Sequence, residues 1–76
     1  MIIFTEHSKA KMKQRNISQK LVEKVLKSPD NILFSYGKRK IAHKKIGKLF
    51  LRVIFKKEKD KIIVITAHWI KKWRSK

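Results

Sequence analysis

The spacing of apolar residues changes once along this chain, next to Pro29, and this change constrains the fold more than any other feature of the sequence. Before Pro29, four apolar residues follow the i, i+1, i+4, i+5 pattern of one packed helix face: Leu21, Val22, Val25 and Leu26. After Asn31, four segments rich in β-branched and aromatic residues alternate with short polar or glycine-containing stretches. The sequence therefore predicts helices in its first part and a sheet in the remainder.

Local signals set the bounds of the predicted elements. Residues 2–4 form a short apolar strand, and Thr5 supplies the N-cap oxygen of a first helix over residues 6–15. Asn16 suits the left-handed position that ends such a helix, and Ser18 caps a second helix that runs to about residue 27. Four strands are predicted over 31–36, 39–46, 49–57 and 61–69, joined at Gly37-Lys38, Gly47-Lys48 and Glu58-Lys59-Asp60.

The predicted order of elements is β-α-α-β-β-β-β, which defines an α+β fold. With only 76 residues the chain supports one hydrophobic core, so a single domain over residues 1–76 is expected. Segments 49–55 and 62–70 are apolar at almost every position, as in central strands. We expect the two N-terminal helices to pack on one face of a small antiparallel sheet and to leave the opposite face open for function.

Charge indicates the class of partner. Lysine and arginine number 22, whereas aspartate and glutamate number 5, so the formal net charge is +17. Repulsion among so many cations disfavours the compact state, so a polyanionic partner is expected, most commonly nucleic acid. An anionic membrane and an acidic protein are the alternatives. A Lys-rich proteome explains part of the excess, but such proteomes usually raise glutamate together with lysine.

Several classes of site are missing from the sequence. It has no Cys, its two Gly residues stand apart and its five acidic residues are scattered, so zinc clusters, P-loops and two-metal nuclease sites are not expected. No apolar run reaches the roughly 18 to 20 residues of a membrane span. We expect a soluble, cytoplasmic protein that uses no cofactor or metal and has no membrane partner.

If it is an enzyme, the reaction open to it is RNA cleavage by the 2′-hydroxyl, in which His or Lys moves protons and Arg or Lys stabilises the phosphorane.

Turn lengths predict which side chains of the sheet are neighbours. Two-residue turns at the Gly-Lys pairs place Ile32 opposite His43, and His43 opposite Arg52. A two- or four-residue loop in the last hairpin places Ala67 beside Arg52, with three further residues on the same face: Lys45, Phe50 and Trp69. A three-residue loop instead brings in one of two other residues, His68 or Thr66. His43 and His68 are both candidates for function, although a lone histidine on a strand is more often structural.

The first helix offers a second polar cluster. His7, Lys11 and Arg15 recur at i, i+4 and i+8 and project from one side of the helix, although an ordinary solvated face has the same spacing. Three aromatic side chains near the basic segments are able to stack on unpaired bases: Tyr36, Trp69 and Trp73. For Trp69, the alternative is that it fills the core.

The same residues resemble those of a known family. Residues 5–18 resemble the "His-Ala-x-x-Arg-Met-x-x-Arg-Gly-Ile-Ser" opening of the DUF4258 family, and the resemblance continues at Val22, Val25, Leu26, Pro29 and in the segments 51–55 and 63–67. The motif matches at His7, Met12, Arg15, Ile17 and Ser18, and it differs at Ser8, Lys11 and Asn16. Lys11 keeps the charge of the usual Arg without its planar fork, and Asn16 tolerates the left-handed conformation of the usual Gly.

This family is grouped with RelE/ParE- and BrnT-like toxins. The resemblance therefore implies a RelE-like toxin fold, ribonuclease activity and neutralisation by a separate antitoxin, often acidic or DNA-binding. We accordingly expect a toxin-like, metal-independent endoribonuclease of a toxin–antitoxin system that cleaves messenger RNA, with the ribosome as one expected place of action. The alternatives are a non-enzymatic basic nucleic-acid-binding protein and a protein that docks an acidic partner.

The candidate site residues fall into two groups. The candidate catalytic residues are His7, Arg15, His43 and Arg52. The candidate RNA-binding residues are Lys11, Lys38, Arg39, Lys44, Lys45, Trp69, Lys71, Trp73 and Arg74. We expect the cations to gather over the open face of the sheet, where a sugar-phosphate chain is able to lie.

Overall fold

The chain folds in the predicted order of elements, and the α+β fold is confirmed. The computed structural model describes residues 1–71, and this part of the chain contains two α-helices and five strands. They are β1 (Ile2–Phe4), α1 (Glu6–Gln14), α2 (Gln19–Lys27), β2 (Asn31–Phe34), β3 (Arg39–Ile46), β4 (Leu49–Glu58) and β5 (Lys61–Ile70). A short 3-10 turn, Tyr36–Lys38, lies between β2 and β3. Two predicted RNA-binding residues, Trp73 and Arg74, lie outside the described residues.

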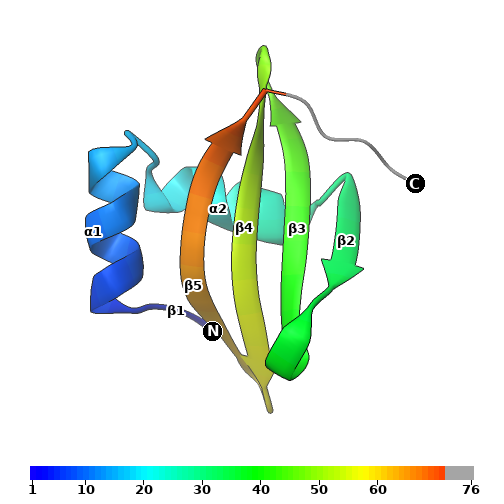
Figure 1. Ribbon diagram of the computed structural model, residues 1–76. Helices are drawn as coiled ribbons and strands as arrows, with labels where there is room; N and C mark the ends of the chain where they lie inside the picture. The colour runs from blue at the N-terminus through cyan, green and yellow to red at the C-terminus, as the bar shows by residue number, and fades with distance from the viewer. Residues whose placement is uncertain (72–76) are drawn as a thin grey trace.

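The strands form one sheet in the order β1-β5-β4-β3-β2 (Figure 1). The pairs from β2 to β5 are antiparallel, whereas β1 runs parallel to β5. The antiparallel sheet predicted for the last four strands is therefore confirmed, and β1 adds a parallel strand at its edge, so the complete sheet is mixed. Short hairpin turns dictate antiparallel pairing, but β1 reaches its partner only after both helices and three strands, so no turn sets its direction.

Both helices begin and end where the sequence predicts, within one residue. The hydroxyl groups of Thr5 and Ser18 each accept the backbone N–H three residues later, at 3.0 and 3.1 Å. Asn16 adopts a φ of 56°, and the N–H of Ile17 donates to the carbonyl of Met12 at 2.9 Å. This is the Schellman ending of a helix, and it turns the chain from α1 into α2.

The helices cover one face of the sheet, and the core lies between them and that face. α2 crosses behind β3 and β4, while α1 runs beside β5 (Figure 1). The core residues are at most 6% exposed: Met12, Ile17, Val22, Val25, Ala42, Leu51, Val53, Phe55, Val64 and Ala67. Residues that alternate with them along β4, such as Arg52 and Ile54, point to the opposite side. We call this opposite side, which neither helix covers, the open face.

The hairpin between β2 and β3 differs from its prediction by one residue. Ile32 pairs with Ala42, and Asn31 is the residue opposite His43, so the predicted Ile32–His43 pair is wrong. The connection is not a two-residue turn, because β2 stops at Phe34 and β3 begins at Arg39. Residues 35–38 form a longer loop, and the N–H of Ser35 donates to the carbonyl of Arg39 at 2.8 Å across its ends. The next turn has the predicted length, and the predicted His43–Arg52 pair is confirmed.

A β-bulge changes the register of the last hairpin. Glu58 pairs with Lys61 across a two-residue tip, but the pairing shifts between Ile54 and Phe55, so that Arg52 pairs with His68. One extra residue in a strand moves every later side chain to the other face. Of the two registers left open for this hairpin, the one that places Ala67 and Trp69 on the face of Arg52 is therefore excluded, because they pair with Val53 and Leu51 on the helix side. The alternative that brings His68 beside Arg52 is observed, although the tip has two residues and not three. Lys45 and Phe50 do share the open face with Arg52.

Candidate functional site

Four polar residues form one row across the open face. The register places Asn31 of β2 opposite His43 of β3, His43 opposite Arg52 of β4, and Arg52 opposite His68 of β5. Cross-strand partners project on the same side of a sheet, with Cβ atoms about 5 Å apart. This polar row, Asn31-His43-Arg52-His68, therefore sets one guanidinium group between two imidazoles.

Arg52 is held in place by His43. The Nε of Arg52 donates a hydrogen bond of 3.0 Å to Nε2 of His43, whose side chain is fully buried. An imidazole that accepts at Nε2 is neutral and carries its proton on the other ring nitrogen. Burial, the positive charge of Arg52 and then His68 lower the pKa of His43 to about 4. His43 thus orients the guanidinium group of Arg52 while it remains uncharged at neutral pH.

Arg15 reaches the polar row from α1. Its Nη1 donates to the carbonyl of Ala67 at 2.9 Å and to the hydroxyl of Thr66 at 3.4 Å, while its own carbonyl accepts from the indole N–H of Trp69 at 2.9 Å. These bonds fix the end of α1 against β5. Burial lowers the pKa of His68, and the nearby charges of Arg52 and Arg15 lower it further.

The site therefore combines two cations with two imidazoles that stay neutral at neutral pH. Their residues come from α1, β3, β4 and β5, so the arrangement exists only in the folded chain. A neutral imidazole is able to accept a proton, and a guanidinium group stabilises negative charge that develops nearby. The cluster therefore offers groups able to accept a proton and groups able to stabilise negative charge, side by side on the open face.

We predict that the lowered pKa of His43 makes the protein less stable in mild acid. In the unfolded chain His43 binds a proton near pH 6.5, but in the folded chain it does so only near about pH 4. The contribution of neutral His43 to the free energy of unfolding is therefore fully present above about pH 6.5 and is lost as the pH falls below it. The free energy of unfolding, measured by urea denaturation, should fall by about 2 kcal/mol between about pH 7 and about pH 5, a range above the titration of ordinary carboxylates. His43→Gln should remove most of this pH dependence, and an unchanged slope would contradict the assignment.

His7 and Lys11 lie on the same helix as Arg15 but further from the polar row. His7 is exposed in the first turn of α1, about 12 Å from Arg15 along the helix axis at the usual rise per residue. Lys11 is half-buried, one turn before Arg15. Of the predicted polar seam on this helix, the structure brings Arg15 to the polar row and leaves His7 at the far end of the helix.

The other described candidates lie in different places. Lys44 points to the helix side, where its Nζ donates to the carbonyl of Ser28 at 2.8 Å and pairs with Asp30 at 3.6 Å. Trp69 is also on the helix side and packs against the core, which is the alternative considered for it above. Lys45 is exposed on the open face, and Lys71 is exposed just after β5.

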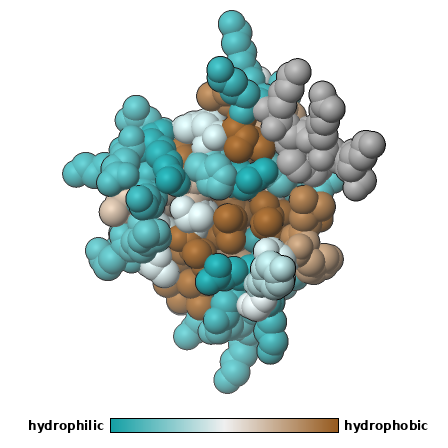
Figure 2. All heavy atoms as spheres, in the orientation of Figure 1, coloured by the Kyte–Doolittle hydropathy of each residue, from teal (hydrophilic) through white to brown (hydrophobic). Residues whose placement is uncertain are grey.

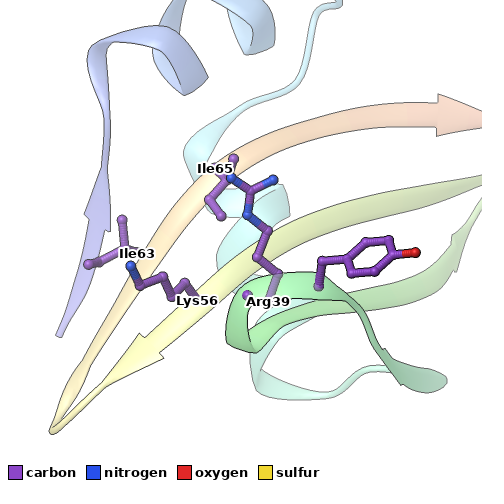
Figure 3. A pocket seen from close by; sticks show the side chains of 6 residues that line it. Arg39, Lys56, Ile63 and Ile65 are labelled. Carbon is purple, nitrogen blue, oxygen red and sulfur yellow. The ribbon is translucent and has the colours of Figure 1, made fainter.

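Arg39 lies at the far end of the open face, where it lines a hollow of about 520 Å³, and Lys38 lines the hollow next to it. We call the first of these the Tyr36 hollow, and its lining residues are Tyr36, Gly37, Arg39, Lys56, Ile63 and Ile65. In Figure 3 the side chain of Arg39 extends toward Ile65, and that of Lys56 extends toward Ile63. A second hollow of about 590 Å³ adjoins it and is lined mainly by lysines: Lys38, Lys56, Lys57, Lys59 and Lys61, with Gly37 and Glu58.

An apolar belt separates the polar row from the Tyr36 hollow. Its residues are Leu33, Ile41 and Ile54, which follow one another across the sheet, and Thr66 continues the same line on β5. Figure 2 shows apolar atoms gathered in the middle of this face and hydrophilic atoms around them. Exposed lysines also cover both helices, so the expected gathering of cations over the whole open face is wrong; the cations of this face lie at its two ends and in the polar row.

Within residues 1–71, no three His, Asp or Glu side chains lie close enough together to hold a metal ion. None of the helices in this part of the chain is long and apolar enough to cross a membrane. The sequence left open whether His68 lies beside Arg52, and His68 was not among the candidate site residues. The continuous apolar run before it has no alternation from which the bulge, and hence the register, is readable.

Fold and site together define a small α+β domain with an arginine held between two neutral imidazoles on the open face of its sheet. The model of a family described as "Domain of unknown function (DUF4258)" matches residues 4–69, and the chain belongs to this family. The family identified by resemblance from the sequence is thereby confirmed. No curated protein and no solved structure matches the chain.

Proposed function

We propose that the protein is a toxin-like, metal-independent endoribonuclease that cleaves messenger RNA at the polar row. The observation that carries this proposal is the placement of Arg52 between two neutral imidazoles, with Arg15 at the edge of the same cluster. Cleavage of RNA by its own 2′-hydroxyl needs a proton acceptor and a cation at the phosphate, and it needs no metal. The ribosome is one expected place of action, and the protein would act on messenger RNA in the cytoplasm.

His68 is the proposed proton acceptor. It is half-buried at the rim of the cluster, and its lowered pKa keeps it unprotonated at neutral pH. The 2′-oxygen bonds to phosphorus as the bond from phosphorus to the 5′-oxygen breaks. The 2′-hydroxyl proton moves to the imidazole of His68, and the departing 5′-oxygen takes a proton from water. The products are a 2′,3′-cyclic phosphate and a 5′-hydroxyl end.

The guanidinium groups of Arg52 and Arg15 stabilise the phosphorane. Their planar donors match two phosphate oxygens at once, which a lysine ammonium group does not do. His43 is a positioning residue, because it touches Arg52 and is itself fully buried. The exposure of the two histidines separates their roles. His43 is buried and orients Arg52, whereas His68 is half-buried and is able to contact the substrate.

A direct assay tests the proposal. The purified protein is incubated with single-stranded RNA in EDTA, and the products are analysed for 2′,3′-cyclic phosphate ends. A matched RNA that carries 2′-deoxyribose at the cut position should resist cleavage, because it lacks the nucleophile. If neither free messenger RNA nor messenger RNA on ribosomes is cut, the endoribonuclease proposal is wrong.

The hollows at the far end of the open face favour a second candidate function. They are rich in lysine and arginine and contain no imidazole, so they are suited to bind phosphates without reacting with them. A non-enzymatic nucleic-acid-binding protein would show tight binding that weakens steeply with salt, and no cleavage products in the same assay.

The proposed toxin requires a neutralising partner. The net charge of +17 supports a small acidic antitoxin, because opposite charge favours association and offsets the self-repulsion of the chain. The grouping with RelE/ParE- and BrnT-like toxins supports the same kind of partner.

A further inference from the structure

The Tyr36 hollow lies on the same face as the polar row but is chemically different from it. Tyr36 is 92% exposed at its edge, an unusual position for so large an aromatic side chain. Ile63 and Ile65 form an apolar floor, and Arg39 and Lys56 supply positive charge. An exposed ring beside a cation and an apolar floor is the combination that binds one nucleotide of a single strand, its base by stacking and its phosphate by charge.

The two cations of the hollow are not equally available. Lys56 pairs with Glu58 at 3.0 Å, so part of its charge is already neutralised. No acidic group within residues 1–71 forms an ion pair with Arg39, whose side chain is exposed. Arg39 is therefore the stronger candidate to bind a phosphate, and Glu58 opposes the approach of an anion.

The strands set the distance between the hollow and the polar row. Arg39 pairs with Lys56, and His43 pairs with Arg52 four positions further along both strands. At the usual rise of a strand, this separation is about 13 Å. About four stacked nucleotides span this distance, and a more extended RNA strand spans it with fewer nucleotides. The apolar belt lies between them and offers a surface against which bases pack.

We infer that the Tyr36 hollow is a subsite for one nucleotide of single-stranded RNA, whose base stacks on Tyr36 and whose phosphate contacts Arg39. The RNA strand runs from this subsite across the apolar belt to the polar row. The inference rests on the proposed function and specifies its substrate: an unpaired RNA strand long enough to reach both places. Double-stranded RNA does not fit, because its bases are not free to stack on the ring.

Binding of an uncleavable RNA tests the subsite independently of catalysis. A labelled 2′-O-methyl hexanucleotide, which spans both places, is titrated with the full chain, and fluorescence anisotropy reports the dissociation constant. Tyr36→Ala should weaken binding about tenfold through loss of one stacked base, whereas Tyr36→Phe should bind as the wild type does. Arg39→Ala should weaken binding and lower the salt slope by roughly one released counterion.

Matched controls separate the subsite from general charge. Lys24→Ala removes an exposed cation of α2 and should leave the dissociation constant unchanged. A dinucleotide is too short to reach both the Tyr36 hollow and the polar row. A dinucleotide bound at the polar row does not contact Tyr36, so the Tyr36→Ala variant should bind it with most of the affinity of the wild type. Because both Tyr36 and Arg39 are exposed, neither substitution removes core packing.

Glu58 provides a test in the opposite direction. Glu58→Gln frees Lys56 from its ion pair and removes a negative charge beside the hollow, so it should tighten hexanucleotide binding about two- to threefold. If Tyr36→Ala and Arg39→Ala both bind the hexanucleotide as the wild type does, the subsite is refuted, even if the protein cleaves RNA. Conversely, dependence on Tyr36 without any cleavage would support the subsite and refute only the endoribonuclease.

Discussion

Arg52→Ala is expected to lower the rate constant of RNA cleavage by about 10²–10³-fold, the usual loss when one preorganised donor to a developing charge is removed. The reason lies in the geometry of the polar row, where a buried imidazole holds this guanidinium group through a bond of 3.0 Å. Single-turnover cleavage in EDTA measures the effect, because it reports the chemical step without product release.

The conservative variant Arg52→Lys sharpens this prediction. It keeps the positive charge but loses both the Nε donor and the planar fork, so it should restore only a small part of the lost rate. Lys24→Ala serves as the matched control, since it removes one cation from the outer surface of α2. Circular dichroism checks that each variant is folded. A folded Arg52→Ala protein that cleaves at the wild-type rate would remove the basis for the proposed site.

His68→Asn is expected to lower the cleavage rate by about 10²–10⁴-fold, which is the contribution of a positioned general base. The pH profile gives a signature that a structural role would not. His68 must be unprotonated to act, and burial and two neighbouring cations lower its pKa from the usual 6.5, so the midpoint of the rise in the wild-type rate should lie below about pH 6.5. The variant should lose this rise.

His7→Asn tests whether the proton acceptor is His7 on α1 instead of His68 in the polar row. His7 matches the family motif, but it is exposed in the first turn of α1, away from Arg52. We expect its replacement to change the cleavage rate little. A large loss in His7→Asn together with normal activity in His68→Asn would transfer the role to the helix and reject the mechanism proposed for the polar row.

Much of the fold was predictable because its signals are local. Thr5, Asn16 and Ser18 act through bonds to residues within five positions, so their effect is readable without knowledge of the rest of the chain. The two-residue turn at Gly47 is equally local, since its left-handed φ of 65° costs a glycine little, and it was enough to predict the His43–Arg52 pair. The match to the family was carried by residues of the same segments.

The composition of the candidate site was only partly predictable. Arg15 and Arg52 were expected, but nothing in the sequence placed them near one another, because Arg15 acts through hydrogen bonds to residues more than 50 positions away. His68 entered the polar row through the bulge next to Ile54, in a stretch where neighbouring residues on both faces are apolar. Because apolar and polar residues do not alternate in this strand, the sequence fits the observed register and a register shifted by one residue equally well.

The sequence by itself determined the order of the elements, the ends of the helices, the excess of positive charge and the family, because each depends on residue types or on short-range bonds. Only the tertiary structure decided the parallel pairing of β1, the place of His68 beside Arg52 and the separation of the two cationic ends of the open face by an apolar belt. These features depend on strand register and on packing between distant segments. Their energies arise only when the whole sheet has formed, so no local pattern of residues encodes them.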